Sequence, residues 1–382
     1  MNYFDDTKKD PLLGKAVLDS VDEWNRGIEL EDSHFTSTIS TYSRIIKFRY
    51  IFILICLAVI FLIAGFSMTV GAYNISFIES YEIIWCHITG SVYPDTAKDY
   101  IVWDTRVPRV IFAIFGGAAL AVAGAVMQSI LKNPLADSYT TGVSSGAGFG
   151  ATFAMSMGFV VGGMSGVMTF AFLFSLIPTG VIILMSKLTN ASPTTMIMAG
   201  IGIMYIFNAM TTVLMLWADP QSMPAIYAWQ VGSLSNGNVN LGNIPLIVIV
   251  SVVGVGLMCS MAGKINVLAT GDESAKALGI DADKLRIFIL LITGVLAASI
   301  VTFVGIVGFV GLVTPHIVRI FIGADNKYLL PASAIFGGML MLVADQIGRV
   351  VLTTPLPVGV VMAFIGGPLF LWLILRRSKN VW

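Results

Sequence analysis

Residues 106–150 read RVPRVIFAIFGGAALAVAGAVMQSILKNPLADSYTTGVSSGAGFG, and the rest of the chain is interpreted outward from them. An apolar run rich in small residues follows the two arginines and ends at the polar turn KNP, 132–134. A second run opens with glycines spaced every four residues: Gly142, Gly146 and Gly150. This spacing puts the glycines on one helix face, where two backbones can touch inside a bilayer. The stretch therefore predicts two closely packed membrane helices joined by a rigid polar elbow.

The composition places the chain in a membrane. Hydrophobic residues make up 56% of the 382 residues, charged residues make up 12%, and the mean hydropathy is +0.86. An average soluble protein has about 25% charged residues, so too little polar surface remains to cover a water-soluble globule of this length. The formal net charge is zero, and it gives no indication of a nucleic-acid partner. We expect an all-α, polytopic protein embedded in the lipid bilayer.

Residues 1–49 differ from the rest because they are polar and mixed in charge, with acidic residues dominating as far as Asp32. The first apolar run starts near Tyr50 and is long enough to span a membrane, so we expect no cleavable signal peptide. We divide the chain into a cytoplasmic N-terminal extension, 1–49, and a transmembrane domain, 50–378. The sequence does not indicate a role for the extension.

Apolar runs of about 20 residues, the length that spans a bilayer, recur through the transmembrane domain. We place ten of them, at 50–71, 108–131, 141–159, 161–186, 194–217, 243–262, 286–305, 308–322, 330–350 and 357–376. The eighth run is short and glycine-rich, so we expect it to be bent or to span only part of the bilayer.

Basic residues are distributed asymmetrically about these runs. With both termini in the cytoplasm, most Lys and Arg residues lie on the inner side, as the positive-inside rule requires. An even number of runs is needed for this arrangement. The exceptions on the outer side are Lys98, Arg106, Arg109 and Arg349. Three of the four are arginines at the outer ends of predicted helices, and their position on the outer side needs a separate explanation.

Three connecting segments are long enough to carry function. The outer segment 72–105 contains aromatic residues suited to a membrane interface. The outer segment 218–242 contains MPAIYAWQ, 223–230, which predicts a short helix across a pore mouth or an interfacial anchor. The inner segment 263–285 predicts two short helices. The first is opened by acidic residues at 272–273 and ended by Gly279, and the second starts at Asp281 and runs into the seventh apolar run. These two helices form either a docking surface or a plain solvated loop.

Several kinds of chemistry have no motif in the sequence. No G-x-x-x-x-G-K-S/T phosphate loop occurs, so we do not expect the chain to hydrolyse nucleotide itself. The three histidines have no metal-ligand spacing, and we expect neither a metal site nor a cofactor. Asp345 is the ionisable residue that stands out within a run, and its spacing from Arg349 predicts that the two pair with each other. Without a set of carboxylates near the midplane, energy for any transport must come from elsewhere.

The chain resembles the FecCD-type permease subunits of ATP-binding-cassette (ABC) importers for iron–siderophores, haem and cobalamin. The similarity covers about residues 50–378. It is carried by RVPR (106–109), GAALAVAGAVMQSILKNPLADSYTTGVSSGAGFG (117–150), GDESAKALGI (271–280), VGFVGLVTPHIVR (307–319), LLPASAIFGGMLMLVAD (329–345) and LPVGVVMAFIGGPLFLWLILRR (356–377). The acidic N-terminal extension departs from the short start that is usual in the family.

The resemblance implies a ten-helix subunit with the type II importer fold. It would pair with a second permease subunit, identical or different, with two ATPase subunits below and an extracytoplasmic substrate-binding protein above. The motifs imply three sets of functional residues: Arg106, Arg109 and Arg349 for docking the binding protein; Asp272, Glu273, Ala275, Leu278 and Gly279 for coupling to the ATPase; and Asn133, Leu135 and Thr194 at the cytoplasmic gate. Docking on carboxylates of the binding protein would explain why these arginines lie on the outer side despite the positive-inside rule, because guanidinium groups pair well with carboxylates.

From these observations we expect a permease subunit in the cell membrane that imports an iron(III)-siderophore-type chelate by alternating access. The chain itself would not be an enzyme, because separate ATPase subunits would supply the energy. Cobalamin or haem is the competing cargo. An ion-coupled secondary transporter or channel, or a structural membrane scaffold, is the alternative from a different class.

Overall fold

The computed structural model describes residues 19, 43–71, 73–159, 165–188, 193–352 and 354–375. Most of the N-terminal extension, 1–49, lies outside these ranges. The chain divides into two units, Met1–Phe52 and Ile53–Trp382, and the second contains every helix from α2 onward.

Within the described ranges, every regular element is helical. A first helix, Ser43–Thr69, is followed by α2 (Phe77–Thr89), α3 (Thr96–Tyr100), the π-helical turn η1 (Ile101–Arg106), α4 (Val107–Ile130), α5 (Val143–Ser156), α6 (Ser165–Leu188), α7 (Pro193–Trp217), α8 (Met223–Gln230), η2 (Leu241–Asn243), α9 (Ile244–Ser260), α10 (Ala262–Thr270), α11 (Asp272–Ala277), α12 (Ala282–Val304), α13 (Val310–Ile322), α14 (Asn326–Val350) and α15 (Val358–Leu375).

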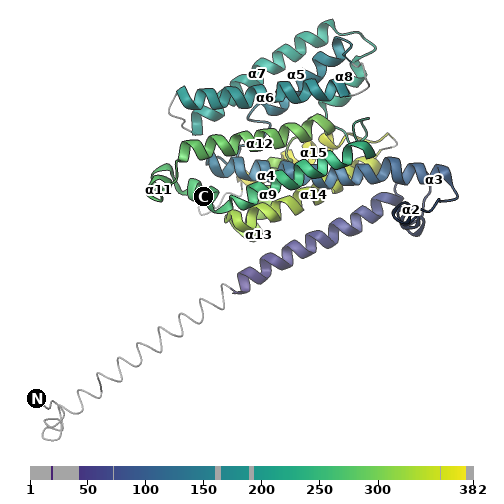
Figure 1. Cartoon of the computed structure of the whole chain (residues 1–382), viewed down its shortest axis with the longest axis horizontal. Helices are drawn as coiled ribbons and strands as arrows, with labels where there is room; N and C mark the ends of the chain where they lie inside the picture. The colour runs from purple at the N-terminus through teal and green to yellow at the C-terminus, as the bar shows by residue number, and fades with distance from the viewer. Residues whose placement is uncertain are drawn as a thin grey trace, which may run out of the picture. The chain divides into compact units, whose positions relative to one another are not determined.

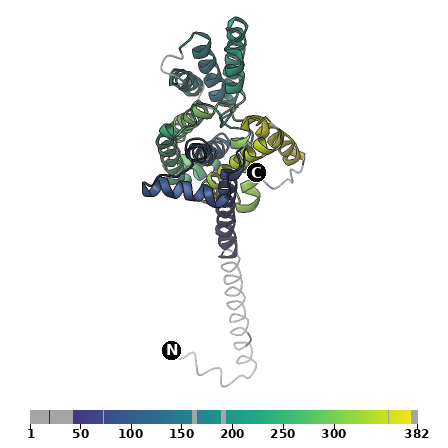
Figure 2. The same cartoon turned by 90° about the vertical axis from the view of Figure 1, so that its right-hand side faces the viewer.

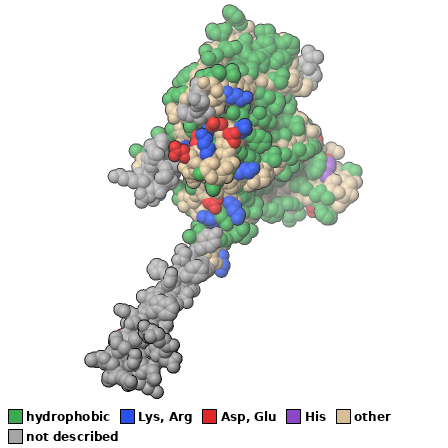
Figure 3. Space-filling model, turned by 60° about the vertical axis from the view of Figure 1, so that its left-hand side comes forward, with side chains coloured by type: hydrophobic (Ala, Val, Ile, Leu, Met, Phe, Trp, Pro, Cys, Tyr) green, Lys and Arg blue, Asp and Glu red, His purple; other side chains and the backbone are tan. Residues whose placement is uncertain are grey.

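Each of the ten predicted runs corresponds to one of these helices. In the described part of the chain, seven helices are long and apolar enough to cross a membrane, while α5, α13 and α15 are shorter or less apolar. The prediction of a short eighth run is confirmed by α13, which has 13 residues. At 1.5 Å per residue it is about 20 Å long, less than the roughly 30 Å of a bilayer core. Hydrophobic side chains cover much of the surface outside the helix ends (Figure 3).

α4 lies at the centre of the helical arrangement (Figure 1). It packs against α14, α13, α9 and α12, and most of its side chains are buried. Small residues make this possible, because Gly117 meets the backbone of Gly337 on α14 and Gly124 meets the backbone of Gly311 on α13. At these two contacts a Cβ atom would overlap the backbone of the neighbouring helix, so the two helices approach as closely as glycine allows.

The expectation that α4 and α5 pack against each other is wrong. α5 packs against α6 and α7, with α12 between that group and α4 (Figure 1). Gly146 and Gly150 do serve helix packing, but they face the backbone carbonyls of Phe174 and Phe170 on α6. Gly142 is the N-cap of α5 with a φ of 80°, and a Cβ there would meet Gly200 on α7 at 3.2 Å and Pro178 on α6 at 3.3 Å. The reason is the elbow: residues 131–142 lead the chain away from α4 before α5 begins.

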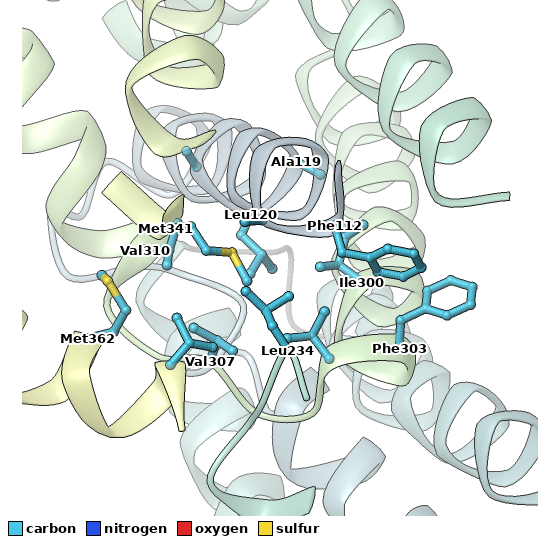
Figure 4. Packing of buried hydrophobic residues seen from close by; sticks show 14 of the residues in the cluster. Phe112, Ala119, Leu120, Leu234, Ile300, Phe303, Val307, Val310, Met341 and Met362 are labelled. Atoms are coloured by element: carbon cyan, nitrogen blue, oxygen red, sulfur yellow. The ribbon is translucent and has the colours of Figure 1, made fainter. Parts of the chain in front are cut away.

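A large apolar core lies between α4, α12 and α14, and the connection after α8 contributes to it. Leu234 is 2% exposed and belongs to the same cluster as Phe112, Phe303 and Val307. In Figure 4 its side chain lies among those of α4 and the end of α12. The rings of Phe112 and Phe303 meet edge to face with centroids 5.6 Å apart, a favourable aromatic geometry. Val239 of the same connection is partly buried against this cluster, so the polar connection 231–243 is anchored by two apolar side chains, Leu234 and Val239.

The glycine contact between α4 and α13 gives a first prediction. Gly124→Ala places a methyl group where the backbone of Gly311 lies, so the helices must move apart and stability falls by about 3 kcal/mol, as for an overpacked core. The matched control is Gly256→Ala on α9, where a Cβ has open space and alanine favours the helix. Thermal unfolding of both variants in detergent measures the difference, and equal melting temperatures would contradict the packing described.

Candidate functional site

Polar side chains gather at two ends of the helices. We call the first the arginine end and define it by Arg106, Arg109, Asp345, Gln346 and Arg349. We call the second the α11 end and define it by the elbow 131–142, α10 and α11. In Figure 3 the α11 side comes toward the viewer, and charged side chains gather there within an otherwise apolar surface.

At the arginine end, the centre of the contacts is Asp345, which is 1% exposed. Arg109 donates from Nε to both carboxylate oxygens, at 3.0 and 2.9 Å, and from its second amino group to Oδ1 at 2.8 Å. Its remaining amino group donates to Ser235 Oγ at 2.6 Å. A two-pronged guanidinium–carboxylate contact of this kind is both strong and specific in geometry. It joins α4, α14 and the connection after α8.

The predicted pairing of Asp345 with Arg349 is therefore wrong. Arg349 donates instead to the backbone carbonyls of Ser67 and Val70, at the end of the first helix and just after it. The physical reason is that Asp345 lies on the α14 face that packs against α4, and a buried carboxylate pairs with the guanidinium that reaches it across that contact. Spacing of four residues makes two side chains neighbours, but it does not decide which face of a helix is buried.

Arg106 is also committed to a contact within the chain. Its side chain is 3% exposed and donates to the carbonyls of Met68 and Tyr73. Arg106 and Arg349 thus both hold the segment around the end of the first helix. The structure brings Arg106, Arg109 and Arg349 to the same end, as the sequence predicts, and gives each an acceptor that the sequence does not reveal.

The neighbouring segment 73–105 is more ordered than the sequence suggests. α2 begins at a capping box formed by Ser76 and Glu79 and ends at Gly90; it is seen end-on in Figure 1 and lengthwise in Figure 2. Lys98 donates to Glu79 at 2.7 Å, and this contact, with the hydrogen bonds from Ser76, lowers the pKa of Glu79 to about 2. Trp85 is 65% exposed. The interfacial role expected for the aromatic residues of this segment stays a prediction.

The short helix predicted at 223–230 is confirmed as α8 (Met223–Gln230). Gln230 donates to Gly148 O at 3.1 Å and to Thr152 Oγ1 at 3.0 Å, both on α5. Trp229 is 3% exposed, whereas Tyr227 is 56% exposed. One side of α8 is thus fixed to α5 and the other is open.

At the α11 end, the predicted short helix over 272–277 is confirmed, and Gly279 follows it with a φ of 75°. Among the coupling residues, Leu278 is 67% exposed and Ala275 is 0% exposed. Glu273 is also exposed, while the Asp272 side chain is 39% exposed and bonded to Arg286 at 2.6 Å. The predicted helix from Asp281 that runs into the seventh apolar run is confirmed, because Asp281 caps α12, which continues without a break from Ala282 to Val304.

The elbow contains two local turns. Asn133 Oδ1 accepts a hydrogen bond from the Leu135 amide at 2.8 Å, and Leu135 is 45% exposed. Asp137 is 5% exposed, and its Oδ1 accepts from the amides of Tyr139 and Thr140 at 3.0 and 2.8 Å. Burial raises the pKa of Asp137, and these hydrogen bonds oppose the rise. Thr194, the third predicted gate residue, is exposed near the start of α7 and belongs to neither turn.

Three residues at this end were missed by sequence reasoning. Asn266 on α10 accepts from the backbone and side chain of Asn326 at 2.9 and 2.8 Å. Arg286 is completely buried beneath α11. A signal for it was present, because a charged residue at the start of an apolar run needs a partner. Lys132 has a φ of 47°, which a non-glycine residue rarely adopts, and its ammonium group approaches Gly271.

Within the ranges that the structure describes, His, Cys, Asp and Glu side chains form no group of three or more that could hold a metal ion.

Known proteins resemble this chain over most of its length. The model of the FecCD transport family matches residues 53–376. The Fe(3+)-citrate import system permease protein of Bacillus subtilis is 33% identical and covers 87% of this chain and 96% of its own. The hemin transport system permease protein of Yersinia pestis is 34% identical, and the match covers 82% of this chain and 92% of the relative. The cobalamin import system permease protein of Halobacterium salinarum is 37% identical, covering 75% and 76%.

A solved structure has the same arrangement of helices. It is described as an inward-facing conformation of a metal-chelate type ABC transporter, and it matches with a TM-score of 0.75 and 27% sequence identity. The match covers 85% of this chain and 99% of that one.

Proposed function

The chain belongs to the FecCD transport family and is thus a permease subunit of an ABC importer, and we propose that its cargo is an iron(III)-siderophore-type metal chelate. The observation that carries the proposal is the match over residues 53–376, which includes both polar ends. Relatives named for Fe(3+)-citrate and hemin, and a structural neighbour described as metal-chelate type, support this cargo class. The relative named for cobalamin keeps that ligand as the second candidate.

ABC importer permeases work with ATPase subunits and a substrate-binding protein. For this chain we propose two ATPase subunits, a second permease subunit and a place in the cytoplasmic membrane with both termini inside. The α11 end would then face the ATPase, with Leu278 and Glu273 exposed toward it and Asp272, Ala275 and Gly279 shaping the helix. Asn133, Leu135 and Thr194 would lie at the inner gate.

The docking proposal for the arginine end takes account of the contacts described. Arg106, Arg109 and Arg349 each have an acceptor within the chain, so a carboxylate on the binding protein would compete with Asp345 or with backbone carbonyls. Arg349 is the most direct candidate because it is partly exposed and bonds to carbonyls and a hydroxyl. Charges at such a rim set orientation and association rate more than affinity.

Reconstitution tests the function. The chain is placed in vesicles with its co-expressed ATPase subunits and binding protein, and uptake of a radiolabelled ferric chelate is measured with and without ATP. We expect uptake only with ATP on the α11 side, and competition by unlabelled ferric chelate rather than by haem or cobalamin. Uptake by the isolated chain that collapses with an ion gradient would contradict the proposal, and competition by cobalamin alone would change the cargo.

A further inference from the structure

The two short helices at the α11 end are attached to the membrane helices in different ways. α10 is fixed through Asn266, which bonds to Asp325 at 2.7 Å and to Asn326 at 2.8 and 2.9 Å. Asn326 is 1% exposed and accepts a hydrogen bond from Ser129 near the end of α4. This chain of hydrogen bonds joins α10 to α14 and α4. α10 is therefore a fixed part of the central helix packing.

Among the described residues, α11 is attached to the rest of the chain through one ion pair and one buried small side chain. Gly271 separates it from α10 with a φ of 141°, a conformation that favours glycine. Ala275 is buried in a second apolar cluster, which includes Leu268 on α10 and Ile289 on α12. Asp272, in the first turn, bonds to Arg286 of α12 at 2.6 Å. A change in the angle of α11 at Gly271 would therefore leave Asp272 joined to α12.

Arg286 is buried to an unusual degree for a charged side chain. It is 0% exposed, and its Nε and Nη1 have no hydrogen-bond partner in the described part of the chain. A carboxylate oxygen of Asp283 lies 3.5 Å from Nη1, so the contact with Asp272 is the shorter one. A buried guanidinium that loses its partner is strongly unfavourable. When α11 moves, Arg286 and its helix therefore tend to move with it.

The start of α11 also lies beside the elbow. A Cβ at Gly271 would lie 3.7 Å from Lys132 Nζ, so the start of α11 adjoins the residue that opens the elbow. The start of α11 thus contacts both α12, through Asp272 and Arg286, and the connection from α4 to α5.

We propose that Arg286 is a positioning residue that transmits displacement of α11 to α12. The proposal rests on the proposed function, because it takes α11 as the element that the ATPase moves. Arg286 has no role in contacting the cargo or the nucleotide. Through its contact with Asp272, Arg286 would convert a displacement of the short helix α11 into a displacement of the long helix α12.

The test compares Arg286→Met with Lys284→Met in the complete transporter. Methionine fills the buried space at 286 without a charge, and Asp272 can turn to water, so the fold is kept while the contact is lost. Lys284→Met removes a charge on the same helix, where the pair with Asp281 is exposed by 86% and 52%. We expect Arg286→Met to bind its ATPase and hydrolyse ATP, with uptake per ATP falling about tenfold, within the usual range of coupling energies. Lys284→Met should match the unaltered protein.

A second measurement follows α11 directly. Spin labels replace Lys264 on α10 and Lys276 on α11, both exposed, in a background without the native cysteines. The distance distribution should broaden in Arg286→Met and stay unchanged in Lys284→Met. Unchanged uptake per ATP and an unchanged distribution would overturn the inference. If Leu278→Asp also left coupling intact, the proposed function of α11 would fail; if Leu278→Asp lowered coupling, only the role of Arg286 would fail.

Discussion

Leu278→Asp is expected to remove most ATP-driven uptake while leaving the permease folded. Leu278 is 67% exposed at the end of α11, so a carboxylate there costs the isolated chain little. If α11 docks on the ATPase as proposed, Leu278 would be buried in that interface. Losing a buried interface side chain and introducing a charge costs at least about 2 kcal/mol, close to a loss of affinity of about 30-fold. Uptake and co-purification of the ATPase subunits measure the effect.

Ala269→Asp is the matched control, because it adds the same charge at an exposed position on α10. We expect this variant to keep uptake within about twofold, as surface substitutions usually change free energies by less than about 0.5 kcal/mol. Ala275→Asp is not an equivalent test. Ala275 is 0% exposed, so a carboxylate there would be buried and would displace α11 in the isolated chain. Full uptake in Leu278→Asp would mean that the ATPase contacts another surface.

α11 shows what the sequence can predict. Its acidic first turn, its length and the glycine after it are local features, and local features determine where a short helix begins and ends. The helices that correspond to the ten predicted runs are predictable for the same reason, because each coincides with an apolar run that can be recognised in the sequence alone. The family resemblance, based on motifs along the chain, agrees with the match over residues 53–376.

Contacts between distant parts of the chain were not predictable in this way. Glycines at 142–150 indicate close packing without naming the partner helix, and the partner is α6 instead of α4. Asp345 needs a cation, and the neighbour in sequence was Arg349, whereas the neighbour in space is Arg109. α10 has a mixed, weakly apolar sequence, and Asn266 acquires its role only when the start of α14 lies beside it. Each of these results depends on which helix faces are buried.

The Arg109–Asp345 pair leads to the second large effect. Asp345→Ala leaves the guanidinium of Arg109, 12% exposed, without its carboxylate between α4 and α14. Removing one partner of a buried pair typically costs about 3–5 kcal/mol because the remaining charge is uncompensated. We therefore expect a large fall in the melting temperature of the purified chain in detergent. The segment held by Arg106 and Arg349 should keep its contacts, since neither arginine bonds to Asp345.

The double variant Arg109→Met/Asp345→Leu separates the buried charge from the loss of contacts. Apolar residues of similar size in place of a buried pair are often neutral or stabilising, so the double variant should recover most of the stability lost in Asp345→Ala. Glu79→Gln serves as the comparison outside the core, because its pair with Lys98 is partly exposed and such pairs contribute little to stability. A double variant as unstable as Asp345→Ala would show that the hydrogen bonds from Arg109 to Ser235 and from Gln346 to Asp345, and not the buried charge, determine the stability of this end. Recovery of stability with loss of binding-protein docking would in turn assign Arg109 to docking, because the fold would no longer depend on its charge.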